Sequence, residues 1–223
     1  MAVNRSESER TAFILQNTRL VPPFLCPEMR LHLITELCPL WHATEPELAV
    51  LGIGDPYWGF CWAGGQALAR YILDHGDEFS GKRVLDFGAG CGVEAVAAMM
   101  SGARSVLAAD IDPFAATATQ LNARANGVSV ETTTEDLIGR ELSGFDAVIA
   151  GDMFYDPAFA RKVLSWFSSL GSAGMEVFLG DPSRGNLPPA AALSPLAVYQ
   201  ATADTDLAGK HLQRTTVYAL KSR

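Results

Sequence analysis

Three glycines and one aspartate have the spacing of a site for an adenosine-bearing cofactor. Gly88, Gly90 and Gly92 alternate directly after the apolar run 82–87, and Asp110 follows 22 residues after Gly88. Glycines at a strand-to-helix turn let a ligand approach the backbone closely, and the helix start offers free N–H groups. An acidic residue at the end of the next strand can accept the hydroxyl groups of a ribose. The pattern therefore predicts a nucleoside-cofactor site.

The glycine spacing distinguishes two cofactors. Dinucleotide sites read G-x-G-x-x-G or G-x-G-x-x-A, because the third small residue lets the helix pack beside a pyrophosphate. Here Val93 stands at that position, Gly92 comes one residue earlier, and the loop holds no basic residue for a phosphate. The form G-x-G-x-G is typical of seven-strand methyltransferases. We therefore expect S-adenosylmethionine as the cofactor, with NAD as the alternative.

A second group of polar residues follows the apolar run 146–151. Asp152 and Tyr155 lie in the segment Gly-Asp-Met-Phe-Tyr-Asp. In open α/β sheets, ligands bind outside the carboxyl ends of the strands near the point where the strand order reverses. We expect both side chains to face the cofactor's reactive group; the alternative is a loop carboxylate with a half-buried tyrosine. Asp136 is either an acceptor for an adenine amino group or a solvated turn or helix cap.

Aromatic residues crowd the segment 56–62, Pro-Tyr-Trp-Gly-Phe-Cys-Trp. An indole is a good platform for adenine or for a cationic group, whereas clustered aromatics more often fill a core. We expect Trp62 to contact the cofactor, and Tyr57 and Trp58 to serve in packing. The later segment 180–184, Gly-Asp-Pro-Ser-Arg, either shapes a substrate channel or forms a structural turn.

The elements that must position these residues alternate between strand and helix from residue 82 onward. This alternation predicts an α/β fold of the Rossmann-like, seven-strand methyltransferase kind, with a mostly parallel sheet. Strands are expected at 82–87, 105–110, 128–133, 146–151 and 175–180, and helices at 93–100, 113–126 and 157–170. Segments 196–203 and 215–220 predict a C-terminal antiparallel hairpin, preceded at 187–195 by a loop with a short helical piece.

Residues 1–80 form an N-terminal helical and aromatic appendage to the cofactor-binding core, 81–223. Apolar residues recur at helical spacing in 6–17 and 27–38, and a further helix is expected from Gly65 to His75. We expect core and appendage to build one domain.

Length and composition set limits on the class of protein. The chain has 223 residues, which fits one α/β domain, and 48% of them are hydrophobic, which excludes a mostly disordered chain. The net charge of −8 makes broad nucleic-acid binding unfavourable, and no apolar run is long enough for a membrane span. The four cysteines show no metal-site spacing, so we expect no metal, reduced thiols and a cytoplasmic location.

Several motifs together resemble a known family. The segments PYWGFCWAGGQAL, VLDFGAGCG, AADIDP, GDMFYD and GDPSR are similar to those of the lysine methyltransferases of electron transfer flavoprotein β subunit, over about Trp58 to Arg184. The resemblance implies that Asp152 to Tyr155 match a D-x-x-Y signature at a lysine channel. It also implies a ribose-binding role for Asp110 and a cofactor-side position for Trp62. The N-terminus does not look like the transit peptide of mitochondrial members, which favours a bacterial cytosolic version.

These observations define the candidate site. The catalytic candidates are Asp152 and Tyr155, and the cofactor-binding candidates are Trp62, Asp86, Gly88, Ala89, Gly90, Asp110, Ile111, Asp136 and Gly151. The implied reaction is direct SN2 transfer of a methyl group to a lysine of the flavoprotein β subunit. A free lysine has a pKa near 10.4, so burial must favour its neutral form. We expect Asp152 to orient the amine without acting as a general base.

Other classes of function stay open from the sequence. A methyltransferase of the same fold that acts on small molecules, or a non-catalytic cofactor-binding protein, would share the glycine motif. An NAD-dependent enzyme is less favoured because of Val93 and the terminal hairpin.

Overall fold

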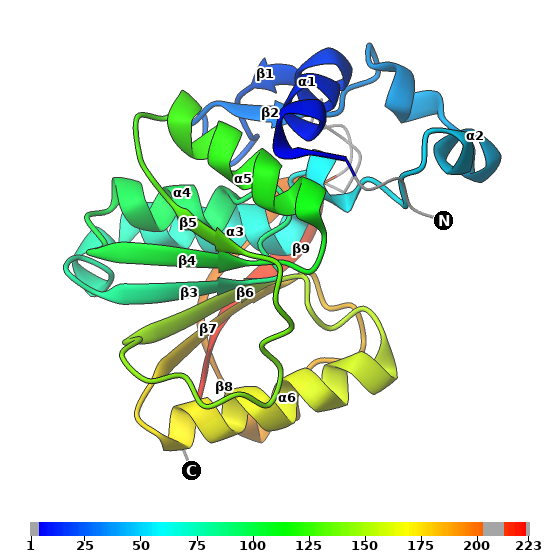
Figure 1. Cartoon of the computed structure of the whole chain (residues 1–223). Helices are drawn as coiled ribbons and strands as arrows, with labels where there is room; N and C mark the ends of the chain where they lie inside the picture. Colours follow the sequence, from blue (N-terminus) through cyan, green and yellow to red (C-terminus); the bar gives the residue numbers. More distant parts are fainter. Residues whose placement is uncertain (1–4, 203–211, 222–223) are drawn as a thin grey trace.

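A mostly parallel sheet of seven strands forms the centre of the molecule. The computed structural model describes residues 5–202 and 212–221, and in them the strand order is β5-β4-β3-β6-β7-β9-β8 (Figure 1). The parallel strands are β3 (Arg83–Phe87), β4 (Ser105–Ala109), β5 (Glu131–Thr133), β6 (Ala147–Gly151) and β7 (Glu176–Asp181). The strand β9 (Leu212–Leu220) runs antiparallel between β7 and β8 (Leu193–Thr202). The predicted fold class and the closing hairpin are confirmed.

Helices cover both faces of the sheet. The helices α3 (Ala63–Asp74), α4 (Val93–Met100) and α5 (Pro113–Ala125) lie on one face, and α6 (Pro157–Ser172) lies on the other (Figure 1). Successive strand residues point to opposite faces, so Val84 joins the core beneath α3 and α4, whereas Leu85 joins the core against α6. Each such fully buried aliphatic side chain contributes about 1.5–3 kcal/mol.

Aspartates and prolines fix where two helices begin beside the strand ends. Asp112 accepts a hydrogen bond from the Phe114 N–H at 2.8 Å, with Pro113 at the first helical position of α5. Asp156 caps α6 in the same way, at 2.7 Å from the Phe159 nitrogen. Such caps are worth about 1 kcal/mol each. They hold the two helix starts at the carboxyl edge of the sheet.

The N-terminal appendage agrees with the sequence in one part and differs in another. Helix α1 (Glu7–Asn17) is confirmed, with a capping box between Ser6 and Glu9. The helix predicted over 27–38 is wrong, because this segment holds β2 (Leu31–Leu33), which pairs antiparallel with β1 (Arg19–Val21). Leu31 and Leu33 are buried on either side of half-exposed His32, which is the two-residue period of a strand. The segment then continues into η1 (Pro39–His42) and α2 (Glu45–Val50).

Element boundaries differ elsewhere by a few residues. α3 begins at Ala63, two residues before its predicted start, and β5 keeps only the last three residues of the run 128–133. The short helical piece is η4 (Ala190–Ala192), but β8 begins at Leu193, so the loop expected over 187–195 is wrong for its last three residues. Pro195 is tolerated because β8 is an edge strand with a bulge there. Residue 203, the predicted strand end, lies outside the described residues.

The appendage packs onto α5 through aromatic side chains. Trp58, 1% exposed, stacks on Phe114 with ring centroids 5.5 Å apart, and Phe13 meets the same ring edge-on. The predicted packing role of Trp58 is confirmed. The four cysteines are all buried free thiols. No helix in residues 5–202 and 212–221 combines the length and apolarity that crossing a bilayer needs.

Candidate active site

The glycine loop between β3 and α4 has the backbone that its sequence predicts. Gly88, Gly90 and Gly92 have φ angles of 75°, 52° and 75°, in the left-handed region that favours glycine. A Cβ at Gly92 would lie 2.7 Å from Thr119, and one at Gly88 would collide with Met153. A Cβ at Gly90 would instead extend into open space, with its nearest neighbour 3.9 Å away. Two glycines thus allow packing, and Gly90 leaves room for a ligand.

Asp110 lies at the end of β4 and binds this loop directly. Its Oδ2 accepts a hydrogen bond from the Gly90 N–H at 2.9 Å, and its Oδ1 accepts one from the Asp112 N–H at 2.9 Å. Burial raises the pKa of Asp110, while the two backbone N–H groups lower it. Each carboxylate oxygen retains a lone pair for a hydroxyl group, and the neighbouring Ile111 is 74% exposed. An acid beside an exposed apolar surface fits a ribose with its attached base.

Two further carboxyl groups are buried beneath the loop. Asp86 accepts a hydrogen bond from the Ala95 N–H at 3.0 Å, and its other oxygen has no protein partner among the described residues. Burial raises the pKa of Asp86 to about 8. Glu94 is also buried, and desolvation, followed by the charges of Asp86 and Asp152, raises its pKa. Sequence reasoning missed Glu94, although an acidic residue inside an apolar, alanine-rich helix was a visible signal.

Asp152 is held in a strained backbone at the end of β6. Its φ angle is 59°, and its N–H donates to the Gly180 carbonyl at 2.9 Å. Its Oδ2 accepts a hydrogen bond at 3.0 Å from the Gly65 N–H, which is one of the free donors of the first turn of α3. A Cβ at Gly64 would lie 2.6 Å from that oxygen, and one at Gly151 would lie 2.6 Å from the Gly65 nitrogen. Glycines therefore permit this close approach of α3 to β6.

Arg184 approaches Asp152 from the loop that follows β7. Its Nε and Nη2 atoms both donate to Asp152 Oδ1, at 3.0 Å and 2.8 Å. Its guanidinium carbon lies 5.7 Å from the centroid of the Trp62 ring, close enough for a cation–π contact. The Arg184 N–H donates to Asp181 Oδ1 at 2.9 Å. The segment 180–184 is thus a structural turn that also delivers a side chain to the candidate site.

Exposed side chains form a rim around these groups. Tyr155 is 61% exposed and stacks on Phe159 with ring centroids 5.5 Å apart. Partial burial, followed by the charges of Asp110 and Asp156, raises the pKa of Tyr155. Tyr57 is 60% exposed and meets Trp62 edge-on at 5.6 Å, so the packing role predicted for Tyr57 is wrong. We call Tyr57, Ile111 and Tyr155 the exposed rim.

The structure brings most of the predicted site residues to one edge of the sheet. Gly88 touches Met153, so the glycine loop and the segment 152–155 are in direct contact, and Ala89 is buried within that loop. Asp136 is exposed in a turn after β5, where its Oδ1 accepts a hydrogen bond from the Ile138 N–H at 3.0 Å. Of its two interpretations, the structure shows the turn; a contact with adenine stays a prediction.

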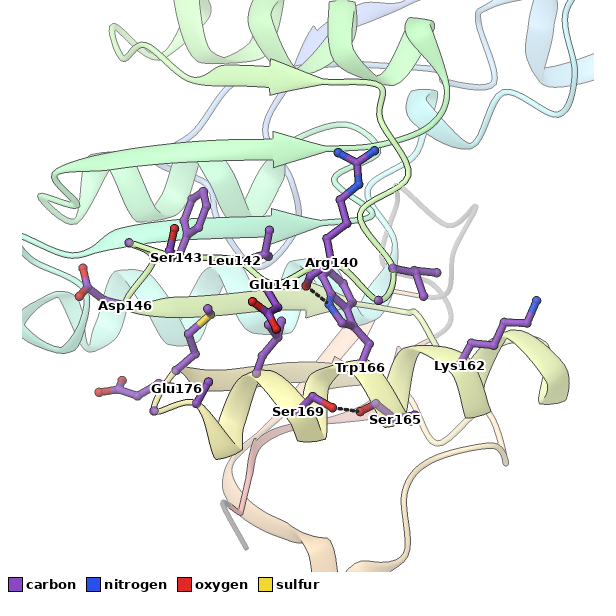
Figure 2. A pocket seen from close by; sticks show the side chains of 18 of the residues that line it. Arg140, Glu141, Leu142, Ser143, Asp146, Lys162, Ser165, Trp166, Ser169 and Glu176 are labelled. Carbon is purple, nitrogen blue, oxygen red and sulfur yellow. Dashed lines mark hydrogen bonds between the residues drawn. The ribbon is translucent and has the colours of Figure 1, made fainter.

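A hollow on the face of the sheet covered by α6 contains none of the predicted residues. The loop 138–146, α6 and the start of β7 line it, with Trp166 donating to the Arg140 carbonyl at 2.9 Å (Figure 2). Lys162 and Glu176 bring charges of both signs to it (Figure 2). The hollow runs along α6, from Lys162 near the start of that helix to Glu176 at the start of β7. Chemistry in open α/β sheets is found at the carboxyl edge.

Comparison with known proteins shows a match to one family model and similarity to individual relatives along most of the chain. Residues 66–152 match the family model described as ribosomal protein L11 methyltransferase (PrmA). The chain is 42% identical over 215 residues to the electron transfer flavoprotein beta subunit lysine methyltransferase of Xenopus laevis, covering 94% of this chain and 86% of the relative. It is 41% identical over 181 residues to the Homo sapiens protein of the same name, covering 80% and 68%.

Solved structures agree at the level of the fold. A ribosomal protein L11 methylase from Lactobacillus delbrueckii subsp. bulgaricus superposes with a TM-score of 0.50 at 22% identity, covering 71% of this chain and 78% of that one. Magnesium protoporphyrin IX methyltransferase from Synechocystis PCC 6803 with bound SAM gives 0.50 at 19% identity, covering 70% and 77%.

The comparisons decide between the classes that the sequence left open. The predicted methyltransferase class is confirmed, and with it S-adenosylmethionine as the cofactor in place of NAD. The glycine loop, Asp110 and Ile111 fit the adenosine part of that cofactor. With about 40% identity across most of both sequences, the chain belongs to the electron transfer flavoprotein beta subunit lysine methyltransferase family.

Proposed function

We propose that this chain transfers methyl groups from S-adenosylmethionine to lysine side chains of the electron transfer flavoprotein beta subunit. The observation that carries the proposal is the direct contact between the glycine loop and the segment with Asp152 and Tyr155. A group bound on the loop would lie beside these two polar side chains. The names of the relatives support the substrate.

Three parts of the chain would hold the cofactor. Gly90 offers open space at the loop, Asp110 offers carboxylate lone pairs to ribose hydroxyl groups, and exposed Ile111 offers apolar surface to adenine. The unpartnered oxygen of Asp86 leaves capacity for one more donor beneath the loop. When bound, S-adenosylmethionine supplies a methyl group on a positively charged sulfur, which a neutral amine can displace.

Asp152 orients the amine in this proposal, and Tyr155 offers it an oxygen acceptor or a ring face. The backbone strain and the Gly65 hydrogen bond fix the Asp152 carboxylate before any substrate arrives. Such positioning is worth about 7–11 kcal/mol in aligned reactions. A carboxylate beside an amine stabilises the ammonium form, so Asp152 is an orienting group and not a general base.

The exposed rim favours a protein as the substrate over a small molecule. Tyr57, Ile111 and Tyr155 are 60%, 74% and 61% exposed; Tyr57 lies near Tyr155, and Tyr155 lies near Asp110, the neighbour of Ile111 in the chain, so they form a patch at the site. A small-molecule site would enclose its ligand on most sides. A protein surface docked on this rim would cover these side chains and remove water from the entering lysine, which lowers the pKa of its amine.

The test is transfer of labelled methyl from S-adenosylmethionine into recombinant electron transfer flavoprotein, with digestion and mass spectrometry to locate the label. We expect label on lysines of the beta subunit with the native chain, and none with Asp152→Ala. Asp77→Asn changes an exposed aspartate in η3 (Gly76–Glu78) and is the matched control, with label expected as for the native chain. Transfer to small amines but not to the flavoprotein would contradict the proposal.

A further inference from the structure

We propose that Arg184 is a positioning residue that neutralises Asp152, so that the amine held beside this carboxylate stays uncharged. The inference rests on the proposed function, in which Asp152 orients an amine. An unneutralised carboxylate would bind the ammonium form, which has no lone pair for the reaction. A fixed cation on the carboxylate opposes that outcome and leaves its oxygen as a hydrogen-bond acceptor.

The contacts of Arg184 are those of a built ion pair and not of a loose surface contact. Nε and Nη2 lie 3.0 Å and 2.8 Å from the same Asp152 oxygen, and the two side chains are only 24% and 11% exposed. Partly buried, doubly hydrogen-bonded pairs of this kind are much stronger than exposed ones. The second Asp152 oxygen is taken by the Gly65 N–H on α3. The carboxylate is therefore held from two elements.

The loop after β7 is shaped to deliver this guanidinium. Asp181 is fully buried at the end of β7, and its Oδ1 accepts the Arg184 N–H at 2.9 Å. Ser183 has a φ angle of 68°, a conformation rare for a residue with a side chain. The Arg184 side chain then lies over the Trp62 ring, with a separation of 5.7 Å. A strained turn and a buried carboxylate thus serve to place one arginine.

Other titratable groups around Asp152 do not supply this positive charge. In the part of the chain that the structure describes, Glu94 of α4 lies close enough to Asp152 for their charges to interact, and Asp181 of β7 interacts with Arg184 itself. On the rim, Tyr57 of η2 (Tyr57–Gly59) lies near Tyr155, and Tyr155 lies near Asp110. All of these groups become negative when they ionise, so none of them supplies a positive charge. Among these described neighbours, the cation that opposes an ammonium is Arg184.

A binding measurement tests the proposal without any protein substrate. Sinefungin carries a protonatable amine where the cofactor carries its methyl sulfonium, and S-adenosylhomocysteine lacks that positive charge. We expect Arg184→Gln to strengthen sinefungin binding relative to S-adenosylhomocysteine by about tenfold at pH 7, because the Asp152 charge is then uncompensated. Arg184→Lys keeps the charge, so its ratio of dissociation constants should stay within about twofold of the native ratio.

Two control variants accompany this measurement of the ratio of dissociation constants: one should shift the ratio in the opposite direction, and the other should leave it unchanged. Asp152→Asn should move the ratio in the opposite direction, because Arg184 then repels the amine. Arg140→Gln removes the same charge from an exposed pair with Glu135 and should leave the ratio unchanged. An unchanged ratio in Arg184→Gln, including equal weakening of both ligands, would overturn the proposal, since that result describes a merely structural residue.

The pH dependence of methyl transfer to the flavoprotein gives a second readout. If Arg184 lowers the pKa of the amine by about one unit, from about 10.4, Arg184→Gln should be about tenfold slower at pH 7.5 and about fivefold slower at pH 9.5. A deficit that is constant across pH, or a faster variant, would contradict the proposal. Absence of transfer by the native chain would instead refute the flavoprotein as substrate, while the sinefungin ratio still decides the role of Arg184.

Discussion

Asp110 and Asp152 end two strands of the same sheet, yet their surroundings differ in charge. Asp110 takes its hydrogen bonds from two backbone N–H groups, of Gly90 and Asp112. Asp152 takes one from the Gly65 N–H and two from the Arg184 guanidinium. Backbone donors leave a carboxylate its full charge for neutral hydroxyl groups, whereas a guanidinium compensates it. From this comparison we propose that Asp110 serves cofactor binding and Asp152 serves amine orientation.

The largest effect should come from removing the Asp152 carboxylate. We expect Asp152→Ala to lower the rate of methyl transfer by at least about 10³-fold, because the amine loses its orienting acceptor. The dissociation constant for S-adenosylhomocysteine, measured by calorimetry, should change by less than about threefold. Because this change also removes a hydrogen-bond acceptor from Arg184 and from the Gly65 N–H, Asp152→Asn should be measured beside it. Native turnover in both variants would remove Asp152 from the reaction.

Asp86 extends the comparison to a carboxyl group that is fully buried. Its pKa is raised from 3.8 to about 8 by burial, so the folded state binds a proton that the unfolded state releases. Stability from this group is present below pH 4 and is lost as the pH rises toward 8. The Asp86→Asn variant cannot lose stability in this way. Between pH 5 and pH 8, its free energy of unfolding should therefore rise relative to that of the native chain by on the order of 2–4 kcal/mol.

Urea unfolding of both proteins at the two pH values measures this difference in the free energy of unfolding. The asparagine oxygen can still accept the Ala95 N–H, and the other buried acids are common to both proteins. A difference that does not depend on pH would show that Asp86 is ionised throughout.

Asp110→Ala should affect the cofactor and not the amine. Loss of the carboxylate removes charge-assisted hydrogen bonds to the ribose, so we expect the affinity for S-adenosylmethionine to fall by about 30–100-fold. Calorimetry gives the dissociation constant directly. Binding as tight as that of the native chain would refute the ribose assignment. The proposed difference in role between Asp110 and Asp152 would then no longer hold for Asp110.

The smallest effect concerns Gly90, the glycine that we expect to face the cofactor. Gly90→Ala places a methyl group in the open space beside Asp110, and we expect about tenfold weaker S-adenosylmethionine binding. Gly127→Ala is the matched control, because Gly127 also has a positive φ of 71° and no atom within 4 Å of a new Cβ. Both variants should lose about 1–2 kcal/mol of stability from backbone strain. Equal cofactor affinity in the two variants would count against Gly90 as a cofactor contact.

The sequence predicted the parts of the molecule in which local pattern and burial agree. The glycine loop, α4 and the core strands were recognisable because parallel strands are buried on both faces and helices begin at clear caps. The segment 27–38 was not, because its leucines satisfy both a helical and a two-residue period, and pairing with β1 decided between them. Tertiary contacts override local spacing in such short apolar runs.

Some residues of the candidate site could likewise be predicted from the sequence, and others could not. Gly90 and Asp110 could be predicted because their spacing is set within one strand–turn–helix unit. The Arg184 contact could not, because it joins residues 32 positions apart through the geometry of two strand ends. Exposure also decided between neighbours that look alike in sequence: Trp58 is buried, whereas Tyr57 is on the rim.

One measurement tests the division between the two carboxylates most directly: the single-turnover rate of methyl transfer to electron transfer flavoprotein at saturating S-adenosylmethionine, for Asp110→Asn and Asp152→Asn side by side. A variant that is defective only in cofactor binding recovers when the cofactor is in excess. We predict that Asp110→Asn approaches the native rate and that Asp152→Asn stays far below it. Recovery of Asp152→Asn, or a deficit of Asp110→Asn that excess cofactor does not relieve, would contradict the account.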